Sequence, residues 1–166
     1  MNKYFKNKNN LNLKIYLQIL RIVNFLLFLN FFVPFNGYRV LLLKLFGAKI
    51  GSGVIIRPGV KVYNPKNIII KNNSWIGENV NLYSLDKILI HENVILSQEV
   101  FLCTGSHNYK SKYFETIHEP IIIHKNSWIC IRSTILMGVI IPKNSIISAA
   151  SIVNKKNLQT ILVDNK

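Results

Sequence analysis

The stretch KIGSGVIIRPGVKVY (Lys49–Tyr63) is built on a unit of six residues. Large aliphatic residues stand at Ile50, Ile56 and Val62, and a small or β-branched residue follows four positions later, as at Val54. The spacing continues, with one interruption, at Ile70, Ile76, Leu82, Ile90, Leu96, Leu102, Ile123, Ile129, Ile135, Ile141, Ile147 and Val153. A repeat of six is typical of a β-helix, in which each short strand points one aliphatic side chain inward. Neither a helical period nor simple alternation explains it.

Three such units form one triangular coil with a strand on each face, and successive coils stack at about 4.8 Å. Columns of aliphatic residues that begin at Ile50, Ile56 and Val62 then run through the repeat region. The sequence predicts an all-β domain over residues 49–166, a parallel β-helix of about five coils. The periodicity does not fix the hand of the coil. The first two coils each carry two extra residues after the third face, around Pro65–Asn67 and Leu85–Lys87.

Residues 1–48 lack the repeat and form a separate N-terminal segment. The stretch Leu11–Gly47 is apolar with helical spacing and is broken at Pro34–Gly37, which predicts helices at about Leu13–Phe32 and Tyr38–Phe46. Polar residues interrupt the first helix. It is therefore a poor candidate for a membrane span, which needs about 20 apolar residues.

Two interpretations of this segment remain open. It can cap the first coil or contact another subunit, because the end coils of a β-helix expose unpaired strand edges. It can instead lie on an anionic membrane surface, with its basic residues facing the headgroups: Lys3, Lys6, Lys8, Lys14 and Arg21. No cleavage site of a secretory signal follows it. We therefore expect a cytoplasmic protein, peripheral at the inner face of the membrane in the second interpretation.

The formal net charge of +14 predicts an anionic partner. No helix-turn-helix, RNA-binding sheet or zinc-finger pattern accompanies the charge, so nucleic acid is a poor candidate. Phosphorylated small molecules and an anionic membrane remain, and the charge can also serve solubility alone. Cys103 and Cys130 fall in different columns, which argues against a disulfide and fits a reducing compartment. No Cys/His spacing suits zinc, so no metal is predicted.

The repeat breaks in the third coil, where residues 105–122 form a predicted loop. A solenoid that interrupts itself at this length usually does so for function. The break begins with CTGSHNY (Cys103–Tyr109), and His107 lies there beside a strand end. Because the imidazole of histidine titrates near neutral pH, it can take a proton from a hydroxyl group as that oxygen attacks an electrophile.

Four stretches resemble the hexapeptide-repeat acyltransferases, and among them the colanic-acid-type sugar O-acetyltransferases. They are LFGAKIGSGVIIRPGV (Leu45–Val60), NSWIGENVNLY (Asn73–Tyr83), LCTGSHNY (Leu102–Tyr109) and SWICIRSTILMGVIIPKNSIISAASIVNK (Ser127–Lys155). The similarity covers about residues 38–163, and the TGSH motif is more specific than any single repeat. The resemblance implies a left-handed β-helix, a homotrimer, and acetyl-CoA bound in clefts between neighbouring subunits. It also implies that the histidine of the TGSH motif, here His107, is the catalytic base.

The resemblance also implies which residues bind the donor. Trp128 matches a tryptophan that flanks the pantetheine channel, although a turn tryptophan like Trp75 fits the sequence equally well. Ser148 and Ala149 match part of a GAGS segment whose backbone approaches the cofactor. Lys155 matches a lysine placed for the nucleotide phosphates, a role that a mobile ammonium group suits.

Four residues around His107 are candidates for binding the acceptor. Asn108 and Tyr109 follow it in the loop, and the column alignment brings Ser84 and Asp86 beside the loop. Asp86 could orient the imidazole, hydrogen-bond the acceptor, or be a solvated residue at a corner of the coil.

Together these features predict an acetyl-CoA-dependent O-acetyltransferase acting on a sugar hydroxyl in capsular or exopolysaccharide biosynthesis. Transfer would be direct, with a backbone N–H group stabilising the oxyanion. The alternative is a non-catalytic trimeric β-helix that scaffolds other proteins. Two departures from the family motivate it: Asn108 replaces the usual Asp, and TILVDNK (Thr160–Lys166) replaces a VAGNPAK-like segment that covers the nucleotide. A third candidate is a metal-dependent hydratase, suggested by His91 and His124 at one column position.

Overall fold

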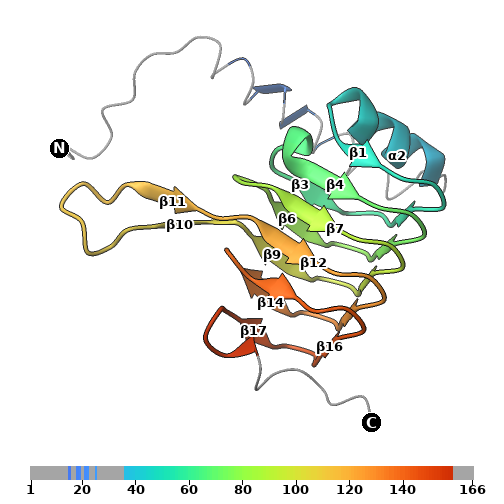
Figure 1. The fold of residues 1–166 in the computed structure, drawn as a ribbon. Helices are drawn as coiled ribbons and strands as arrows, with labels where there is room; N and C mark the ends of the chain where they lie inside the picture. The colour runs from blue at the N-terminus through green and yellow to red at the C-terminus, as the bar shows by residue number, and fades with distance from the viewer. Residues whose placement is uncertain (1–14, 16–17, 20, 23–24, 26–35, 159–166) are drawn as a thin grey trace.

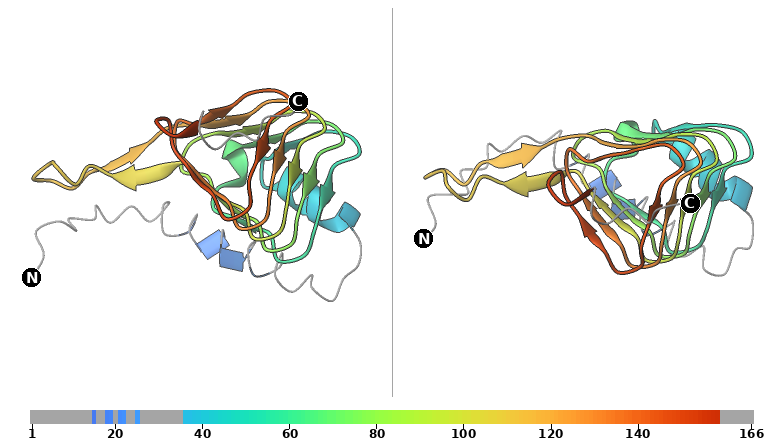
Figure 2. Two further views of the ribbon diagram at one scale, coloured as in Figure 1. Left: turned by 90° about the horizontal axis from the view of Figure 1, so that it is seen from below. Right: turned by 60° about the horizontal axis from the view of Figure 1, so that its bottom comes forward.

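The repeat region folds into a three-sided prism of stacked coils, from which one long hairpin projects (Figures 1 and 2). The structure is a computed structural model, and it describes residues 15, 18, 19, 21, 22, 25 and 36–158. The views along the prism in Figure 2 show a triangular cross-section, with the hairpin leaving from one corner.

Each face of the prism is a parallel sheet with one strand from every coil. The first face contains β1 (Lys49–Ile50), β4 (Ile68–Ile70), β7 (Ile88–Ile90), β12 (Ile121–Ile123) and β15 (Ile140–Ile141). The second contains β2 (Ile55–Ile56), β5 (Trp75–Ile76), β8 (Ile95–Leu96), β13 (Trp128–Ile129) and β16 (Ile146–Ile147). The third contains β3 (Lys61–Val62), β6 (Asn81–Tyr83), β9 (Phe101–Cys103), β14 (Thr134–Leu136) and β17 (Ile152–Val153).

The strand register confirms the predicted columns. Ile50 pairs with Ile70, and the pairing passes up the first face to Ile141 without a slip. The second and third faces follow the predicted alignment in the same way. The inward aliphatic residues from Ile56 to Val153 are almost fully buried. They form one continuous core, and burial of such side chains is the main stabilising contribution to the prism.

The first and second corners of every coil turn through a left-handed residue, three positions after the inward aliphatic one. Asparagine or glycine, which tolerate this conformation, occupy most of these positions: Gly53, Gly59, Asn73, Asn79, Asn93, Asn126 and Asn144. Glu99, Arg132 and Ala150 are the exceptions, and all three lie at the second corner. A residue other than asparagine or glycine at such a left-handed position lowers the stability of the fold by roughly 1–2 kcal/mol.

The third corner is irregular. In the first coil it forms a short 3₁₀ helix, η1 (Pro65–Asn67), and in the third coil it opens into an antiparallel hairpin of β10 (Gly105–His107) and β11 (Thr116–His118). The excursion was predicted as a loop over residues 105–122. The excursion lies where it was predicted and contains this hairpin, and the chain rejoins the first face at Ile121, because both Ile121 and Ile123 point into the core.

Helix α2 (Asn36–Leu45) lies over the first coil, close to the position of the second predicted helix. Leu43, on the inward side of this helix, is fully buried in the core. The Asn36 side chain accepts a hydrogen bond from Ile56 N at 2.7 Å and donates one to Val54 O at 2.8 Å. It therefore satisfies the edge of β2 as a neighbouring strand would. Arg39 is almost completely buried and donates to Ile56 O at 3.4 Å.

Most of the first predicted helix lies outside the described residues, and so do most of the basic residues assigned to a membrane surface. That interpretation stays a prediction. Among the residues that are described, no helix is both long enough and apolar enough to cross a bilayer.

Candidate active site

The hairpin that carries His107 is anchored at its base to the second coil. Thr104 is fully buried, and its hydroxyl donates to Tyr83 O at 2.8 Å and accepts from Asp86 N at 2.9 Å. Glu119 N donates to Thr104 O at 3.0 Å, which closes the neck of the hairpin. Gly105 lets the hairpin pass close to Leu85, since a Cβ atom on it would lie 2.2 Å from Leu85 Cδ1 unless that side chain moved.

A side-chain pair braces the returning strand. His118 Nδ1 lies 2.8 Å from Asp86 Oδ2, which joins β11 to the third corner of the second coil. The hydrogen bond from His118 is the main reason that the pKa of Asp86 lies below its ordinary value. Asp86 was predicted as a candidate partner of His107 or of the acceptor. The structure instead places its carboxylate on His118 and on Lys87 N.

The imidazole of His107 is held by Phe114. The two rings stack with centroids 4.6 Å apart and planes within 6°, and His107 Nδ1 lies 3.1 Å from Phe114 O. A carbonyl oxygen only accepts hydrogen bonds, so Nδ1 carries the proton of the neutral ring and Nε2 keeps its lone pair. The arrangement therefore leaves the nitrogen away from Phe114 able to act as a base.

Phe114 was not foreseen from the sequence. Its backbone has a φ of 45°, which is uncommon for a residue with a large side chain. Strained conformations of this kind cluster at functional sites. Its carbonyl oxygen and its ring both contact the same imidazole. No sequence motif signals this, because the contact depends on the path of the hairpin.

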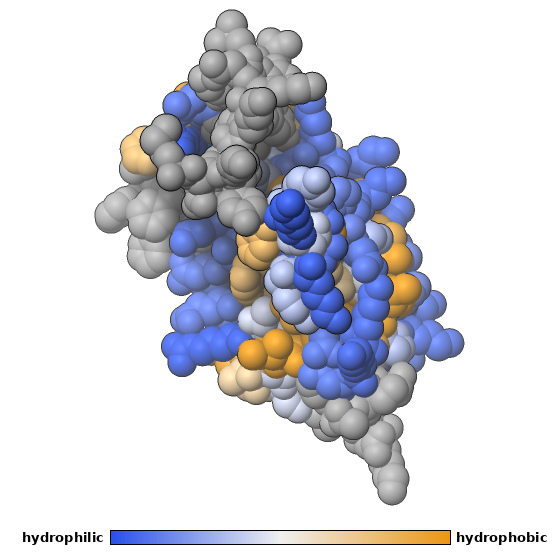
Figure 3. Space-filling model, turned by 90° about the vertical axis from the view of Figure 1, so that its left-hand side faces the viewer, coloured by the Kyte–Doolittle hydropathy of each residue, from blue (hydrophilic) through white to orange (hydrophobic). Residues whose placement is uncertain are grey.

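A cavity of about 400 Å³ opens beside His107. It is lined by Tyr63, Tyr83, Leu85, Gly105, Ser106, His107 and Thr116. The tyrosines come from the third face of the first two coils, and the hydroxyl-bearing residues come from the hairpin. The lining thus combines apolar and polar residues, and the candidate base is one of them. Figure 3 looks toward this side of the prism and shows a mostly hydrophilic surface with separate hydrophobic patches.

The other predicted acceptor-binding residues lie in different settings. Ser84 is fully buried, and its hydroxyl bonds both N and O of Asn64, which corrects its assignment to a ligand. Asn108 donates to Glu115 Oε1 at 2.9 Å across the hairpin and does not contact the His107 ring. Tyr109 is 77% exposed near the hairpin tip. None of these three residues lines the cavity beside His107.

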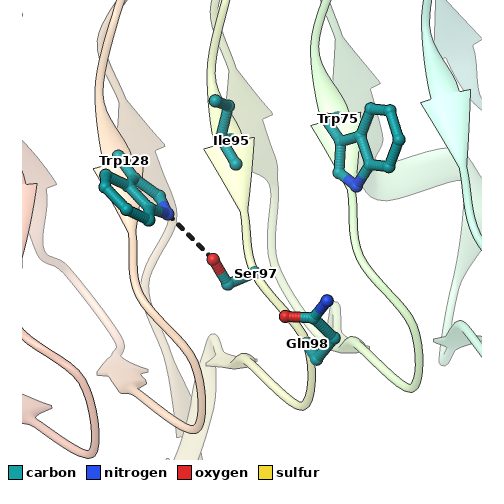
Figure 4. A pocket seen from close by; sticks show the side chains of 5 residues that line it. All are labelled: Trp75, Ile95, Ser97, Gln98 and Trp128. Carbon is teal, nitrogen blue, oxygen red and sulfur yellow. Dashed lines mark hydrogen bonds between the residues drawn. The ribbon is translucent and has the colours of Figure 1, made fainter.

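Trp128 lies on the outward side of β13, in a groove of about 390 Å³ on the second face (Figure 4). Its Nε1 donates to Ser97 Oγ at 2.8 Å. Trp75, Ile95 and Gln98 complete the groove. The tryptophan is therefore a strand residue in the same column as Trp75, not a turn residue. Apolar walls with a few polar groups suit an extended chain that carries amide groups, such as pantetheine.

The remaining predicted donor-binding residues lie at two corners. Ser148 and Ala149 are exposed between β16 and β17, and Ser148 O accepts a hydrogen bond from Ser133 Oγ at 2.8 Å. Lys155 lies beyond β17 at the third corner, where its Nζ pairs with Glu119. An anionic ligand there would compete with the Glu119 carboxylate for this ammonium group.

One chain does not bring the predicted base and the predicted donor groove together. The hairpin with His107 leaves from the corner between the third and first faces. Trp128 lies on the second face, which is the side of the prism opposite that corner. A site that uses both residues therefore needs two copies of the chain.

The cysteines and the other histidines offer no competing centre. Cys103 and Cys130 are both free, and burial raises the pKa of the Cys130 thiol, which disfavours the nucleophilic thiolate. His91 and His124 stack with ring centroids 4.9 Å apart, as the column alignment predicted. Within the described part of the chain, no three His, Cys, Asp or Glu residues are placed to hold a metal ion.

The sequence has a clear relative in Escherichia coli, although no family model matches it. The protein WcaF of Escherichia coli K12, provisionally assigned as a colanic acid biosynthesis acetyltransferase, is 40% identical over 118 residues. The matched residues make up 71% of this chain and 65% of WcaF. The chain thus spans just under two thirds of the length of that relative.

Two solved structures share both fold and sequence. A hexapeptide-repeat acetyltransferase of Vibrio cholerae O1 biovar eltor, complexed with acetyl coenzyme A, is 27% identical with a TM-score of 0.71, over 82% of this chain and 77% of that one. A galactoside acetyltransferase in complex with coenzyme A is 28% identical with a TM-score of 0.71, over 84% of this chain and 72% of that one.

Proposed function

We propose that this chain, which is similar in sequence to the hexapeptide-repeat acetyltransferases and shares their β-helix, transfers an acetyl group from acetyl-CoA to a sugar hydroxyl. The observation that carries the proposal is the geometry of His107. Its Nδ1 hydrogen-bonds Phe114 O, which makes Nε2 the basic nitrogen of the neutral ring, and the residue lines a cavity of about 400 Å³. Relatives that act on galactosides, or are assigned to colanic acid synthesis, support a sugar acceptor in polysaccharide assembly.

The chemistry follows from that nitrogen. Acetyl-CoA supplies the acetyl group as a thioester. His107 Nε2 accepts the proton of the acceptor hydroxyl while the hydroxyl oxygen bonds to the thioester carbonyl carbon. The imidazolium then returns the proton to the departing sulfur. No covalent enzyme intermediate is needed. The setting of the two cysteines agrees with this, because neither thiol has a basic side chain as its hydrogen-bond partner within the described part of the chain.

We further propose that the active protein is a homotrimer. His107 and Trp128 lie on opposite sides of one prism, so a second copy has to complete the site. The outward residues of the second face support this, since all of them are apolar: Ile55, Trp75, Ile95, Trp128 and Ile146. An exposed apolar column of this kind is typical of a subunit contact.

The test is a transfer assay with acetyl-CoA and a panel of sugars. We expect acetyl esters on at least one sugar, and we expect His107→Ala to lower kcat by roughly 10²–10⁴. The matched control is His124→Ala, which removes an imidazole at the first corner. Circular dichroism and the mass of the assembly should be unchanged in both variants.

Calorimetry with CoA separates the enzyme from the scaffold alternative. Absence of CoA binding at millimolar concentration would favour a non-catalytic β-helix. Binding without transfer to any sugar would leave the donor proposal standing and remove the sugar acceptor.

A further inference from the structure

We propose that Tyr63 and Tyr83 form the wall that recognises the acceptor, a pyranose whose apolar face lies against their rings while one hydroxyl meets His107. The inference deepens the proposed function and rests on it. It assigns acceptor recognition to the third face of the first two coils, in place of the loop and corner residues that the sequence suggested.

The two tyrosines reach the cavity because of the coil register. Each follows the inward aliphatic residue of its strand, Val62 in β3 and Leu82 in β6, so each points outward from the third face. They lie on adjacent coils, with ring centroids 4.8 Å apart and planes tilted by 55°. Phe101 continues the row, 6.5 Å from Tyr83 in an edge-on arrangement. The rings therefore hold each other in place beside the hairpin.

The cavity has the two kinds of wall that a pyranose needs. One wall is apolar and consists of the tyrosine rings and Leu85. Another part of the lining carries His107 and Thr116, which pair across the hairpin and so share one of its faces. They offer an imidazole and a hydroxyl group. A sugar ring has an apolar face of C–H groups and a rim of hydroxyl groups, so it complements both parts at once. The volume of about 400 Å³ lies in the range of small-molecule sites.

The tyrosine hydroxyls add polar contacts at the edge of the apolar wall. Burial raises the pKa of Tyr83, so its hydroxyl stays neutral at physiological pH and can both donate and accept. The wall thus offers hydrogen bonds to a sugar without adding a charge next to the base.

The experiment measures acceptor binding separately from transfer. The variants are Tyr63→Leu and Tyr83→Leu, which remove a ring and keep an apolar side chain, and Tyr83→Phe, which keeps the ring. The matched control is Tyr113→Leu, because Tyr113 is 78% exposed at the hairpin tip and does not line the cavity. The probes are methyl β-D-galactopyranoside, methyl α-D-glucopyranoside and methyl α-D-mannopyranoside.

Two readouts are used: saturation-transfer NMR to each glycoside without donor, and steady-state kinetics with acetyl-CoA. We expect each leucine variant to raise the acceptor KM about tenfold or more, with kcat and the KM for acetyl-CoA little changed. Tyr83→Phe should keep most of the affinity, and Tyr113→Leu should match the wild type. A purely structural role would instead lower the melting temperature and leave the acceptor KM unchanged.

The outcomes separate this inference from the proposed function. If the acceptor KM and the saturation transfer are unchanged in both leucine variants, the inference is overturned, but the proposed acetyl transfer is not affected. Absence of saturation transfer from the wild-type protein to all three glycosides would overturn it as well. Saturation transfer that depends on the tyrosines, without acetyl transfer, would support the sugar site and contradict the proposed reaction.

Discussion

His107 depends on a neighbour that contributes its backbone as well as its side chain. The Phe114 carbonyl oxygen fixes which imidazole nitrogen carries the proton, and the ring of the same residue stacks on the imidazole. In many bases of this kind a carboxylate fulfils the orienting role and also stabilises the cation. A carbonyl oxygen orients the ring with less charge stabilisation. The Asn108 side chain, which replaces the usual Asp, makes its bond to Glu115 instead.

The brace between Asp86 and His118 should be visible in the pH dependence of stability. The pKa of Asp86 is lowered in the folded chain, chiefly by the hydrogen bond from His118. The ionised Asp86 carboxylate therefore contributes fully to the free energy of unfolding above the ordinary carboxyl pKa of about 3.9. This contribution is lost as the pH falls through the lower pKa of the folded chain. We expect Asp86→Asn to cost about 0.5 kcal/mol at pH 7, with the difference from wild type shrinking below about pH 4.

Denaturant unfolding at several pH values measures this effect. His118→Ala is the matched control, because it removes the other half of the brace. If Asp86 and His118 act as one unit, the double variant should be no less stable than the less stable of the two single variants. Additive losses, or a difference that persists at pH 2–3 as at pH 7, would show that Asp86 acts without His118.

At the scale of the element, the corners of the coil differ in what they demand of the chain. The second corner has left-handed backbone in every coil, at Gly59, Asn79, Glu99, Arg132 and Ala150. Glu99 and Arg132 form an ion pair along this corner, with Arg132 Nε 2.8 Å from Glu99 Oε2. Because both side chains are largely exposed, the pair recovers little of the conformational cost.

Ala150 should therefore be a site where stability can be gained. Ala150→Asn places a residue that tolerates a φ of 56°, and we expect about 0.5–1 kcal/mol of added stability. The contrasting variant is Gly59→Ala, whose Cβ atom would lie 2.1 Å from Asn79 Oδ1 at a φ of 77°. It should cost about 1–2 kcal/mol. Calorimetric melting of both variants checks the pair, and the account would be contradicted if Ala150→Asn lowered the melting temperature or if Gly59→Ala raised it.

The elements of the prism could be predicted because the signal is repeated. Each inward column from Ile50 to Val153 has the same spacing, and a slip of one residue would expose a whole row of isoleucines. The hairpin at Gly105–His118 carries no such repeat, so its strands and its end at Pro120 were not foreseen. Tyr63 and Tyr83 were missed for a related reason: their meeting with the hairpin depends on the third corner, not on the column.

At the scale of the whole molecule, the candidate site is divided between opposite sides of the prism. The hairpin leaves one corner and Trp128 lies on the face across from it. The sequence motifs indicated both His107 and Trp128, but they could not show that the two residues lie on opposite sides of the prism. A ring of identical subunits with head-to-tail contacts brings such surfaces together and closes on itself.

Mixing two inactive variants tests this arrangement. His107→Ala and Trp128→Ala subunits, each impaired alone, should regain activity when refolded together. In randomly mixed trimers about a quarter of the sites combine an intact His107 with an intact Trp128 from the neighbour. We therefore expect roughly a quarter of the wild-type kcat. The control mixes His107→Ala subunits with His107→Ala,Trp128→Ala subunits, in which no site has an intact His107 and activity should not return.

Recovery no greater than the sum of the separate variants would contradict a divided site. Sedimentation of the mixture has to show a trimer in every case, so that a lack of recovery reports on the site and not on assembly.

The irregular third corner leaves the length of the chain free to vary at one edge. Coils close correctly whether this edge holds a direct turn, a 3₁₀ helix or a hairpin, because the first and second corners alone keep the strands in step. The edge is thus a natural place for grafting: a hairpin of another length or composition could be exchanged there without disturbing the scaffold. The length and composition of the chain at this edge could then change while the supporting framework, with the two tyrosines of its third face, is inherited unchanged.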